Sequence, residues 1–254
     1  FEFYQQNTND LIYEVAIPVG ILPTDKVFTN IGEVRNRGFE VELSSPIMTR
    51  KDFQWNVSFN AAYNKNEIIR LDNTVAGSGE TVYPRGGISG DVGQTIQVLK
   101  VGEAINSFYA YEQLYDGNGD PIYEPVNRTE MYRDVNSDSV INENDLQVIQ
   151  NANPDWLLGL TSVMNYKDID FSFTFRANLG NYVYNNFSSN YGELNRLATP
   201  VPQNIHTSAL ETGFEQKQLL SDYYIENASF LRLDNVTIGY TIDRLAWMRA
   251  RIYF

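Results

Sequence analysis

The stretch that decides the fold of this chain is DFSFTFRA, residues 170–177. Its aromatic side chains Phe171, Phe173 and Phe175 alternate with polar side chains. Successive side chains of a β-strand point to opposite faces, so a strand here has one apolar face and one polar face. The period of two therefore predicts a strand that borders an apolar medium on one side only.

The same alternation recurs in residues 39–44, 55–61 and 236–242. Two antiparallel architectures place such strands side by side. In a soluble β-sandwich the apolar faces of two sheets pack against each other, whereas in a membrane β-barrel they contact lipid and the polar faces line the lumen. The pattern alone predicts an all-β chain and leaves both architectures open.

The lengths of the connections favour the barrel. Short turns are expected at residues 46–52 and 165–168, whereas long polar connections occupy residues 64–93, 116–154 and 181–222. Outer-membrane barrels have short periplasmic turns at one rim and long extracellular loops at the other. Strand directions that alternate on this basis predict about nine antiparallel strands, at residues 1–6, 34–44, 53–63, 94–101, 105–115, 156–165, 169–178, 230–242 and 249–254.

The composition excludes several classes of protein. The formal net charge of −13 argues against a nucleic-acid partner, because phosphate binding needs a basic patch. The absence of cysteine excludes a thiol nucleophile, a disulfide framework and a cysteine-based zinc site. No apolar run of about 18 residues occurs, which excludes a transmembrane helix and leaves a transmembrane strand open. The one histidine, His206, is expected to be a loop residue without a catalytic role.

An acidic stretch at residues 134–145, DVNSDSVINEND, has the spacing of a calcium-binding loop. Calcium takes six to eight oxygen ligands, which EF-hand loops supply from positions 1, 3, 5, 7, 9 and 12. Two departures are Ser139, where glycine is usual, and an aspartate in place of the last glutamate. The alternative is a solvated surface loop. The spacing predicts a structural calcium site with these ligands: Asp134, Asn136, Asp138, the carbonyl of Val140, Asn142 and Asp145.

No catalytic motif accompanies these features: the sequence has no GxSxG elbow, phosphate-binding loop, HExxH or dinucleotide fingerprint. Glu40 and Glu42 share the polar face of one strand, where lining a lumen is a better interpretation than an acid–base pair. Several aromatic residues are expected to anchor at a membrane interface rather than to stack on sugars, namely Tyr109, Tyr111, Tyr115 and Trp156. We therefore expect a protein that is not an enzyme. Residues 146–150 are expected to form one short turn of helix.

Four segments resemble those of the SusC/RagA-like outer-membrane transporters. They are NIGEVRNRGFEV at 30–41, VGEAINSFYAY at 101–111, the acidic loop at 134–145 followed by NPDW at 153–156, and YIENASFLRLDNVTIGY at 224–240. The segments follow one another in the order of the family, from one end of the chain to the other. Their combination makes the resemblance specific.

The resemblance implies a partial antiparallel transmembrane β-barrel of the 22-strand class, with long extracellular loops, in the outer membrane of Bacteroidota. Residues 1–254 would form one barrel domain of a TonB-dependent receptor, cut within strands at both ends, with the plug domain and the TonB box outside it. The implied activity is active import of oligosaccharides or peptides. The implied partners are a SusD-like surface lipoprotein, the TonB–ExbB–ExbD complex acting through the plug, and the lipid bilayer.

The alternative is a secreted β-sandwich that uses the calcium loop to bind a glycan or a protein. The side chains of Phe171, Phe173 and Phe175 distinguish the two architectures. A barrel predicts that they are exposed on the outer surface, whereas a sandwich predicts that a second sheet buries them.

Overall fold

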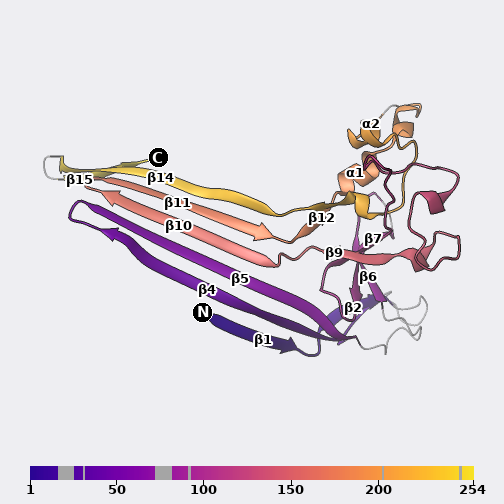
Figure 1. Cartoon of the computed structure of the whole chain (residues 1–254), viewed down its shortest axis with the longest axis horizontal. Helices are drawn as coiled ribbons and strands as arrows, with labels where there is room; N and C mark the ends of the chain where they lie inside the picture. Colours follow the sequence, from indigo (N-terminus) through magenta and orange to yellow (C-terminus); the bar gives the residue numbers. More distant parts are fainter. Residues whose placement is uncertain (17–25, 31, 72–81, 91–92, 202, 246–247) are drawn as a thin grey trace.

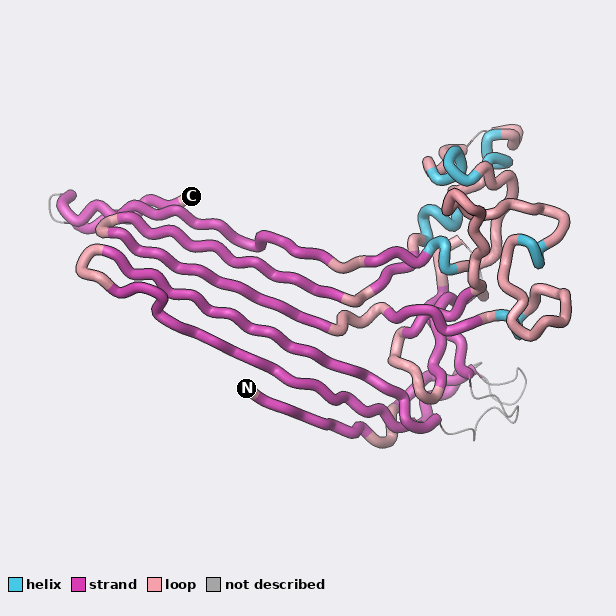
Figure 2. The backbone as a smooth tube through the Cα atoms, in the orientation of Figure 1, coloured by secondary structure: helices cyan, strands magenta, loops and turns pink. Residues whose placement is uncertain are grey.

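An antiparallel sheet of long strands, followed by a loop-rich end, makes up the computed structural model (Figures 1 and 2). The structure describes residues 1–16, 26–30, 32–71, 82–90, 93–201, 203–245 and 248–254. The seven strands of the main sheet are β1 (Glu2–Thr8), β4 (Gly32–Thr49), β5 (Phe53–Leu71), β10 (Trp156–Tyr166), β11 (Ile169–Leu179), β14 (Phe230–Leu245) and β15 (Met248–Tyr253). They lie side by side in the order of the chain, each antiparallel to its neighbours.

The two ends of the sheet differ as the sequence predicts. The β4–β5 and β10–β11 turns lie at one end and are short, since Tyr166 already pairs with Ile169 across the second turn. The connections from β1 to β4, from β5 to β10 and from β11 to β14 all lie at the opposite end (Figure 1). This confirms the predicted contrast between a short-turn rim and a long-loop rim.

The long connections carry the remaining elements. A four-stranded sheet contains β6 (Val82–Gly87), β7 (Thr95–Lys100), β8 (Ser107–Ala110) and β9 (Gln147–Asn151). Two two-stranded antiparallel sheets are formed by β2 (Ile12–Ala16) with β3 (Lys26–Asn30), and by β12 (Tyr182–Tyr184) with β13 (Ile225–Asn227). The helices are short: η1 (Arg128–Glu130), η2 (Glu143–Asp145), α1 (Asn186–Tyr191), η3 (Leu194–Leu197), α2 (Ser208–Thr212) and η4 (Asp222–Tyr224). No helix in the described residues is long and apolar enough to cross a membrane.

The prediction of about nine sheet strands is wrong, because two of them belong to the loop-rich end. Residues 94–101 and 105–115 contain β7 and β8 of the four-stranded sheet. Both strands are shorter than the roughly 9–11 residues that a membrane-spanning strand needs. Leu99 packs with Val34 and Ile68 in a buried core instead of facing outward. The alternating apolar residues of these two segments therefore predicted burial correctly, but the burial is by protein and not by a membrane.

Two local predictions also change. The turn expected at residues 46–52 is shorter, because β4 continues to Thr49 through an irregularity between Pro46 and Met48. The helical turn expected at 146–150 is wrong: those residues belong mainly to β9, and the turn of 3-10 helix precedes them at Glu143–Asp145. The side chain of Asn142 caps that turn by accepting from Asn144 N.

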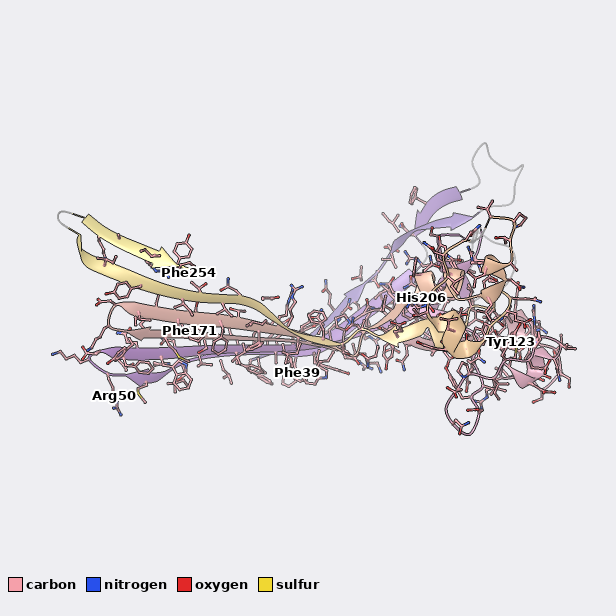
Figure 3. The ribbon with its side chains drawn as sticks, turned by 90° about the horizontal axis from the view of Figure 1, so that it is seen from above. Phe39, Arg50, Tyr123, Phe171, His206 and Phe254 are labelled. Atoms are coloured by element: carbon pink, nitrogen blue, oxygen red, sulfur yellow. The ribbon has the colours of Figure 1, made fainter. Side chains whose placement is uncertain are left out.

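The β-sandwich alternative is wrong. Figure 3 shows the main sheet nearly edge-on, and in the described residues the sheet partners are strands of the same layer. The rings of Phe171, Phe173 and Phe175 are half-buried rather than fully exposed as expected. They shield one another, with centroids 5.8 and 5.5 Å apart along the strand.

Candidate functional site

The register of the main sheet gathers apolar side chains on one face. One row crosses four strands as Phe3, Phe39, Tyr63 and Trp156, and the rows beyond it follow the same pattern. Further members of this apolar face are Val41, Leu43, Phe59, Ala61, Leu158, Leu160, Phe171, Phe173, Phe175, Val236, Ile238 and Ile252. Leu43 and Ile238 are more than half exposed, at 61% and 53%. An apolar surface this large on one side of a single layer requires an apolar medium to cover it.

Two polar groups on the apolar face, from Trp55 and Ser162, form a hydrogen bond with each other. The indole Nε1 of Trp55 donates to the hydroxyl of Ser162 at 2.9 Å, between neighbouring strands β5 and β10. Ser162 is almost fully buried. An unpaired N–H in an apolar medium costs several kcal/mol, on the order of 2–7 kcal/mol for transfer. Because of this hydrogen bond, the indole of Trp55 can lie on the apolar face without an unpaired N–H group.

Aromatic rings border the apolar face at both rims. Near the loop-rich end, Phe39 contacts Phe3, Tyr63 and Trp156 with centroids 6.0, 5.7 and 5.5 Å apart. Near the short turns, Phe53 on β5 contacts Tyr166, 6.5 Å away.

The separation of these aromatic clusters matches a bilayer. From Phe53 to Tyr63 the strand rises about 33 Å at about 3.3 Å per residue. A strand tilted by about 40° then covers about 25 Å along a barrel axis, which is the height of the apolar band of outer-membrane barrels.

The opposite face of the sheet is polar and internally paired. Asp170 accepts from the guanidinium of Arg251 across β14, with Nε 3.0 Å from Oδ1. A bulge in β14 brings Asp234 beside two arginines that lie directly opposite each other, Arg176 and Arg232. The Nε atoms of these arginines lie 3.1 and 2.6 Å from the carboxylate of Asp234. One anion therefore separates two cations that would otherwise repel each other.

The predicted calcium loop folds around its own hydrogen bonds. Asp134 Oδ2 accepts from Ser139 N at 2.7 Å, and Asn136 Nδ2 donates to Asp138 Oδ2 at 2.9 Å. The side chains at the first, third and fifth loop positions thus lie together. Ser139 takes a φ of 66°, the left-handed conformation that glycine would adopt without strain.

Asp145, the last predicted ligand, connects the two ends of the loop. Asp145 is fully buried, and its two oxygens accept from Val135 N at 2.9 Å and Asn142 N at 2.8 Å. The N–H of Asn142, followed by that of Val135, holds the pKa of the Asp145 carboxyl below its usual range. Asn142 Nδ2 donates to the carbonyl of Val140 at 3.2 Å. Within the described chain, no three acidic or histidine side chains are grouped to hold a metal ion, and calcium binding stays a prediction.

Comparisons with known proteins agree with this geometry. The chain is 39% identical over 248 residues to the TonB-dependent receptor SusC of Bacteroides thetaiotaomicron, which covers 95% of this chain and 24% of that protein. It is 27% identical over 256 residues to the TonB-dependent receptor P3 of Formosa agariphila, with 95% and 25% covered. The solved structure of the RagAB peptide transporter superposes with a TM-score of 0.69 at 22% identity, over 99% of this chain and 28% of that one. No family model matches the chain.

The chain is SusC/RagA-like. It spans about a quarter of the length of the curated relatives that it matches. The likeness to RagAB shows the fold, so the main sheet is an open portion of an antiparallel β-barrel. In this SusC/RagA-like frame the apolar face is the outer wall and the polar face is the lumenal wall.

The structure distributes the other residues noted in the sequence over both parts of the SusC/RagA-like fold. Glu40 and Glu42 lie on the lumenal wall, opposite Ala62 and Asn60 of β5. Trp156 lies in the aromatic cluster at the rim of the outer wall, and its role as an interfacial anchor stays a prediction.

Three aromatic residues do not lie at the rim, and that expectation is wrong. Tyr109, Tyr111 and Tyr115 belong to the loop-rich end, where the ring of Tyr111 packs 5.9 Å from that of buried Tyr132. Partial burial raises the pKa of Tyr115 to about 12. His206 lies just before α2, as a loop histidine should, with Nδ1 2.8 Å from the hydroxyl of Ser208.

Sequence reasoning missed a buried polar centre in the loop-rich end. Gln113 Nε2 donates to the carbonyl oxygens of Leu114, Ile122 and Met131 at 3.2, 3.0 and 3.1 Å. Its backbone N–H donates to Asp222 Oδ1 at 2.7 Å. This centre joins the β5–β10 connection to the β11–β14 connection, which are far apart in the sequence. No local pattern of residues predicts it.

Proposed function

We propose that this chain forms part of the wall of an outer-membrane importer of nutrients and has no catalytic role. The observation that carries the proposal is the single-layered sheet with an apolar outer face, bordered by aromatic rings about 25 Å apart along a tilted barrel axis. Among the residues that the structure describes, the lumenal wall offers ion pairs and hydroxyls and no recognisable group of catalytic side chains. The relatives named above are receptors and transporters, which supports the same conclusion.

The proposed orientation follows from the two rims. Short turns face the periplasm in outer-membrane barrels and long loops face the exterior. The β4–β5 and β10–β11 turns would therefore be periplasmic, and the loop-rich end with α1 and α2 would be extracellular (Figure 1).

The proposed cargo is an oligosaccharide or a peptide, captured with a SusD-like surface lipoprotein and drawn inward by TonB–ExbB–ExbD acting on a plug. The RagAB structure is that of a peptide transporter, and the SusC relative is a TonB-dependent receptor. The extracellular end presents exposed apolar side chains, Phe187 and Leu197 among them, on which a lipoprotein could pack.

Transport is tested by deleting the gene in its host and measuring uptake of labelled oligosaccharides and peptides. We expect loss of uptake of one cargo class, restored by the intact gene and abolished by a protonophore that collapses TonB energy. Undiminished uptake of both classes in the deletion strain would contradict the proposal.

Placement in lipid is tested by a pair of substitutions one residue apart on β11. Phe173→Arg puts a charge on the outer wall, at a cost of about 2–4 kcal/mol at the bilayer midplane, whereas Thr174→Arg puts it on the lumenal wall. We expect the first variant of the full-length protein to reach the outer membrane at much lower levels and the second to assemble normally. Equal assembly of the two would contradict a lipid-facing position for Phe173.

We also propose that the loop at residues 134–145 takes up calcium with a structural role. The tight turn at Asp134, Asn136 and Asp138 supports it, since Asp134 accepts from Asp138 N and Asn136 donates to the Asp138 carboxylate, and a cation would neutralise the two carboxylates of this turn. Hydrogen exchange of the full-length protein should slow in this loop when calcium replaces a chelator. The effect should vanish in Asp134→Asn/Asp138→Asn and persist in Asp116→Asn/Asp120→Asn, which alters a nearby acidic turn. Exchange that does not respond to calcium would refute it.

A further inference from the structure

The outer wall carries a row of cations directly beyond its extracellular aromatic cluster. Arg37 pairs with Lys65 across β4 and β5, one row beyond the pair of Phe39 and Tyr63 and on the same face. Arg35 follows in the next row of that face. The chain has a net charge of −13, so three neighbouring cations on the outer face of a barrel are unusual and suggest that an anion binds there.

The charges of this row are only partly compensated within the chain. Like charges directly opposite each other on neighbouring strands are destabilising. Glu67 on β5 lies directly opposite Arg35 and also approaches Arg37 at 3.5 Å, a long contact for an ion pair, so one carboxylate serves two of the three cations. The Nε of Arg35 donates to the amide oxygen of Asn7 at 3.4 Å and not to a carboxylate. Lys65 is exposed and makes no ion pair with the described residues. The row therefore has room for an added anion.

The surface below the cations suits an acyl chain. Phe3, Phe39 and Tyr63 line a shallow groove of about 570 Å³ whose upper border is formed by Arg37 and Lys65. Aromatic side chains anchor at the level of the lipid headgroups, and basic side chains next to them meet phosphates. An apolar floor with a cationic upper border has the polarity of a lipid molecule lying along the wall.

We propose that this groove binds a phosphate-bearing lipid of the outer leaflet, with its phosphate between Arg37 and Lys65 and an acyl chain on the rings below. The inference rests on the proposed placement in the outer membrane and is independent of the cargo. Arg37 would bind the phosphate through two N–H groups, and Lys65 would act as a point charge.

The test uses the full-length protein in detergent micelles and native mass spectrometry, with lipid A carrying two phosphates as the probe. The variant is Arg37→Gln/Lys65→Gln. The matched control is Arg50→Gln/Lys51→Gln, which removes two cations from the opposite end of the same hairpin. Lys65→Gln alone keeps the Arg37–Glu67 contact, so it tests the site even if the double variant folds poorly.

We expect the Arg37→Gln/Lys65→Gln variant to bind lipid A at least about tenfold more weakly, the single variant to bind with intermediate strength, and the control to bind normally. Dephosphorylated lipid A should bind weakly to all of them, and inorganic phosphate should not compete. Equal binding by all variants, or full competition by inorganic phosphate, would overturn the inference. Uptake that persists alongside such a result would leave the proposed transport function standing.

Discussion

At the scale of single residues, the bond between Trp55 and Ser162 offers a sharp test of the outer wall. Ser162→Ala removes the acceptor of the indole N–H in an apolar setting, and we expect a loss of about 1–3 kcal/mol in the free energy of unfolding. Trp55→Phe/Ser162→Ala removes both partners and should recover part of that loss. Denaturant unfolding of the full-length protein in lipid vesicles measures the three values.

The control for this comparison is Ser172→Ala, on the lumenal wall of β11. Ser172 is partly buried, and substitution of a polar residue away from a core or a polar network usually changes stability by within about 0.5 kcal/mol. A double variant that is less stable than Ser162→Ala would show that the hydrogen bond does not account for the effect.

Asp222 gives the loop-rich end a dependence on pH. Burial raises the pKa of its carboxyl, although the N–H of Gln113 acts in the opposite direction. A carboxyl whose pKa is higher in the folded state stabilises the fold below its unfolded pKa, and this contribution is lost as the pH rises through the folded value. We expect the amide protection factors of Gln113 and its neighbours, which correct for the intrinsic effect of pH on exchange, to be higher at mildly acidic pH than at pH 7. Asp222→Asn should reduce this pH dependence, and an unchanged dependence would contradict it.

At the scale of elements, the bulge in β14 shows how one residue organises the contact between two strands, β11 and β14. The extra residue, Asp234, brings its carboxylate to Arg176 and Arg232, which face each other across the strands. Asp234→Asn leaves the two cations opposed, and we expect a loss of about 0.5–1 kcal/mol in the free energy of unfolding, since exposed ion pairs contribute little. Adding Arg232→Gln to Asp234→Asn should restore most of it. A further loss in that double variant would contradict the role given to Asp234.

The sequence contains a signal for this bulge. Leu231 and Leu233 are apolar at odd positions, whereas Val236 and Ile238 are apolar at even positions, so the alternation changes phase between them. A phase change within one strand requires an extra residue, because the side-chain period is two. The strands of the main sheet were predictable because apolar and polar residues alternate over most of their length, which keeps the apolar side chains on one face.

The elements of the loop-rich end could not be predicted in the same way. Residues 94–101 show the alternation of a wall strand, yet Val98 and Leu99 are fully buried by other protein segments, and Leu99 packs against Val34 of β4 and Ile68 of β5. A short apolar stretch reports that something covers it, but protein and lipid give the same pattern. The centre around Gln113 depends on contacts between distant segments, which local spacing does not encode.

At the scale of the whole molecule, one division explains most of the structure. The sheet has an apolar outer face and a polar lumenal face. The loop-rich end packs one core against β4 and β5 and builds a second core from its own elements. Under the proposed placement in the outer membrane, the aromatic rings at Phe53 and Trp156 would mark where the wall leaves the bilayer.

The most direct test of this division is a cysteine scan of residues 171–175 on β11, facilitated by a chain that contains no cysteine of its own. Each position of the full-length protein in lipid vesicles carries a spin label, and relaxation by oxygen and by a water-soluble nickel complex is measured. Positions 171, 173 and 175 should respond to oxygen, and 172 and 174 less so, in a strict period of two. If labels at the three phenylalanine positions were shielded from oxygen and nickel alike, a protein layer would cover them, and the account of the outer wall would be wrong.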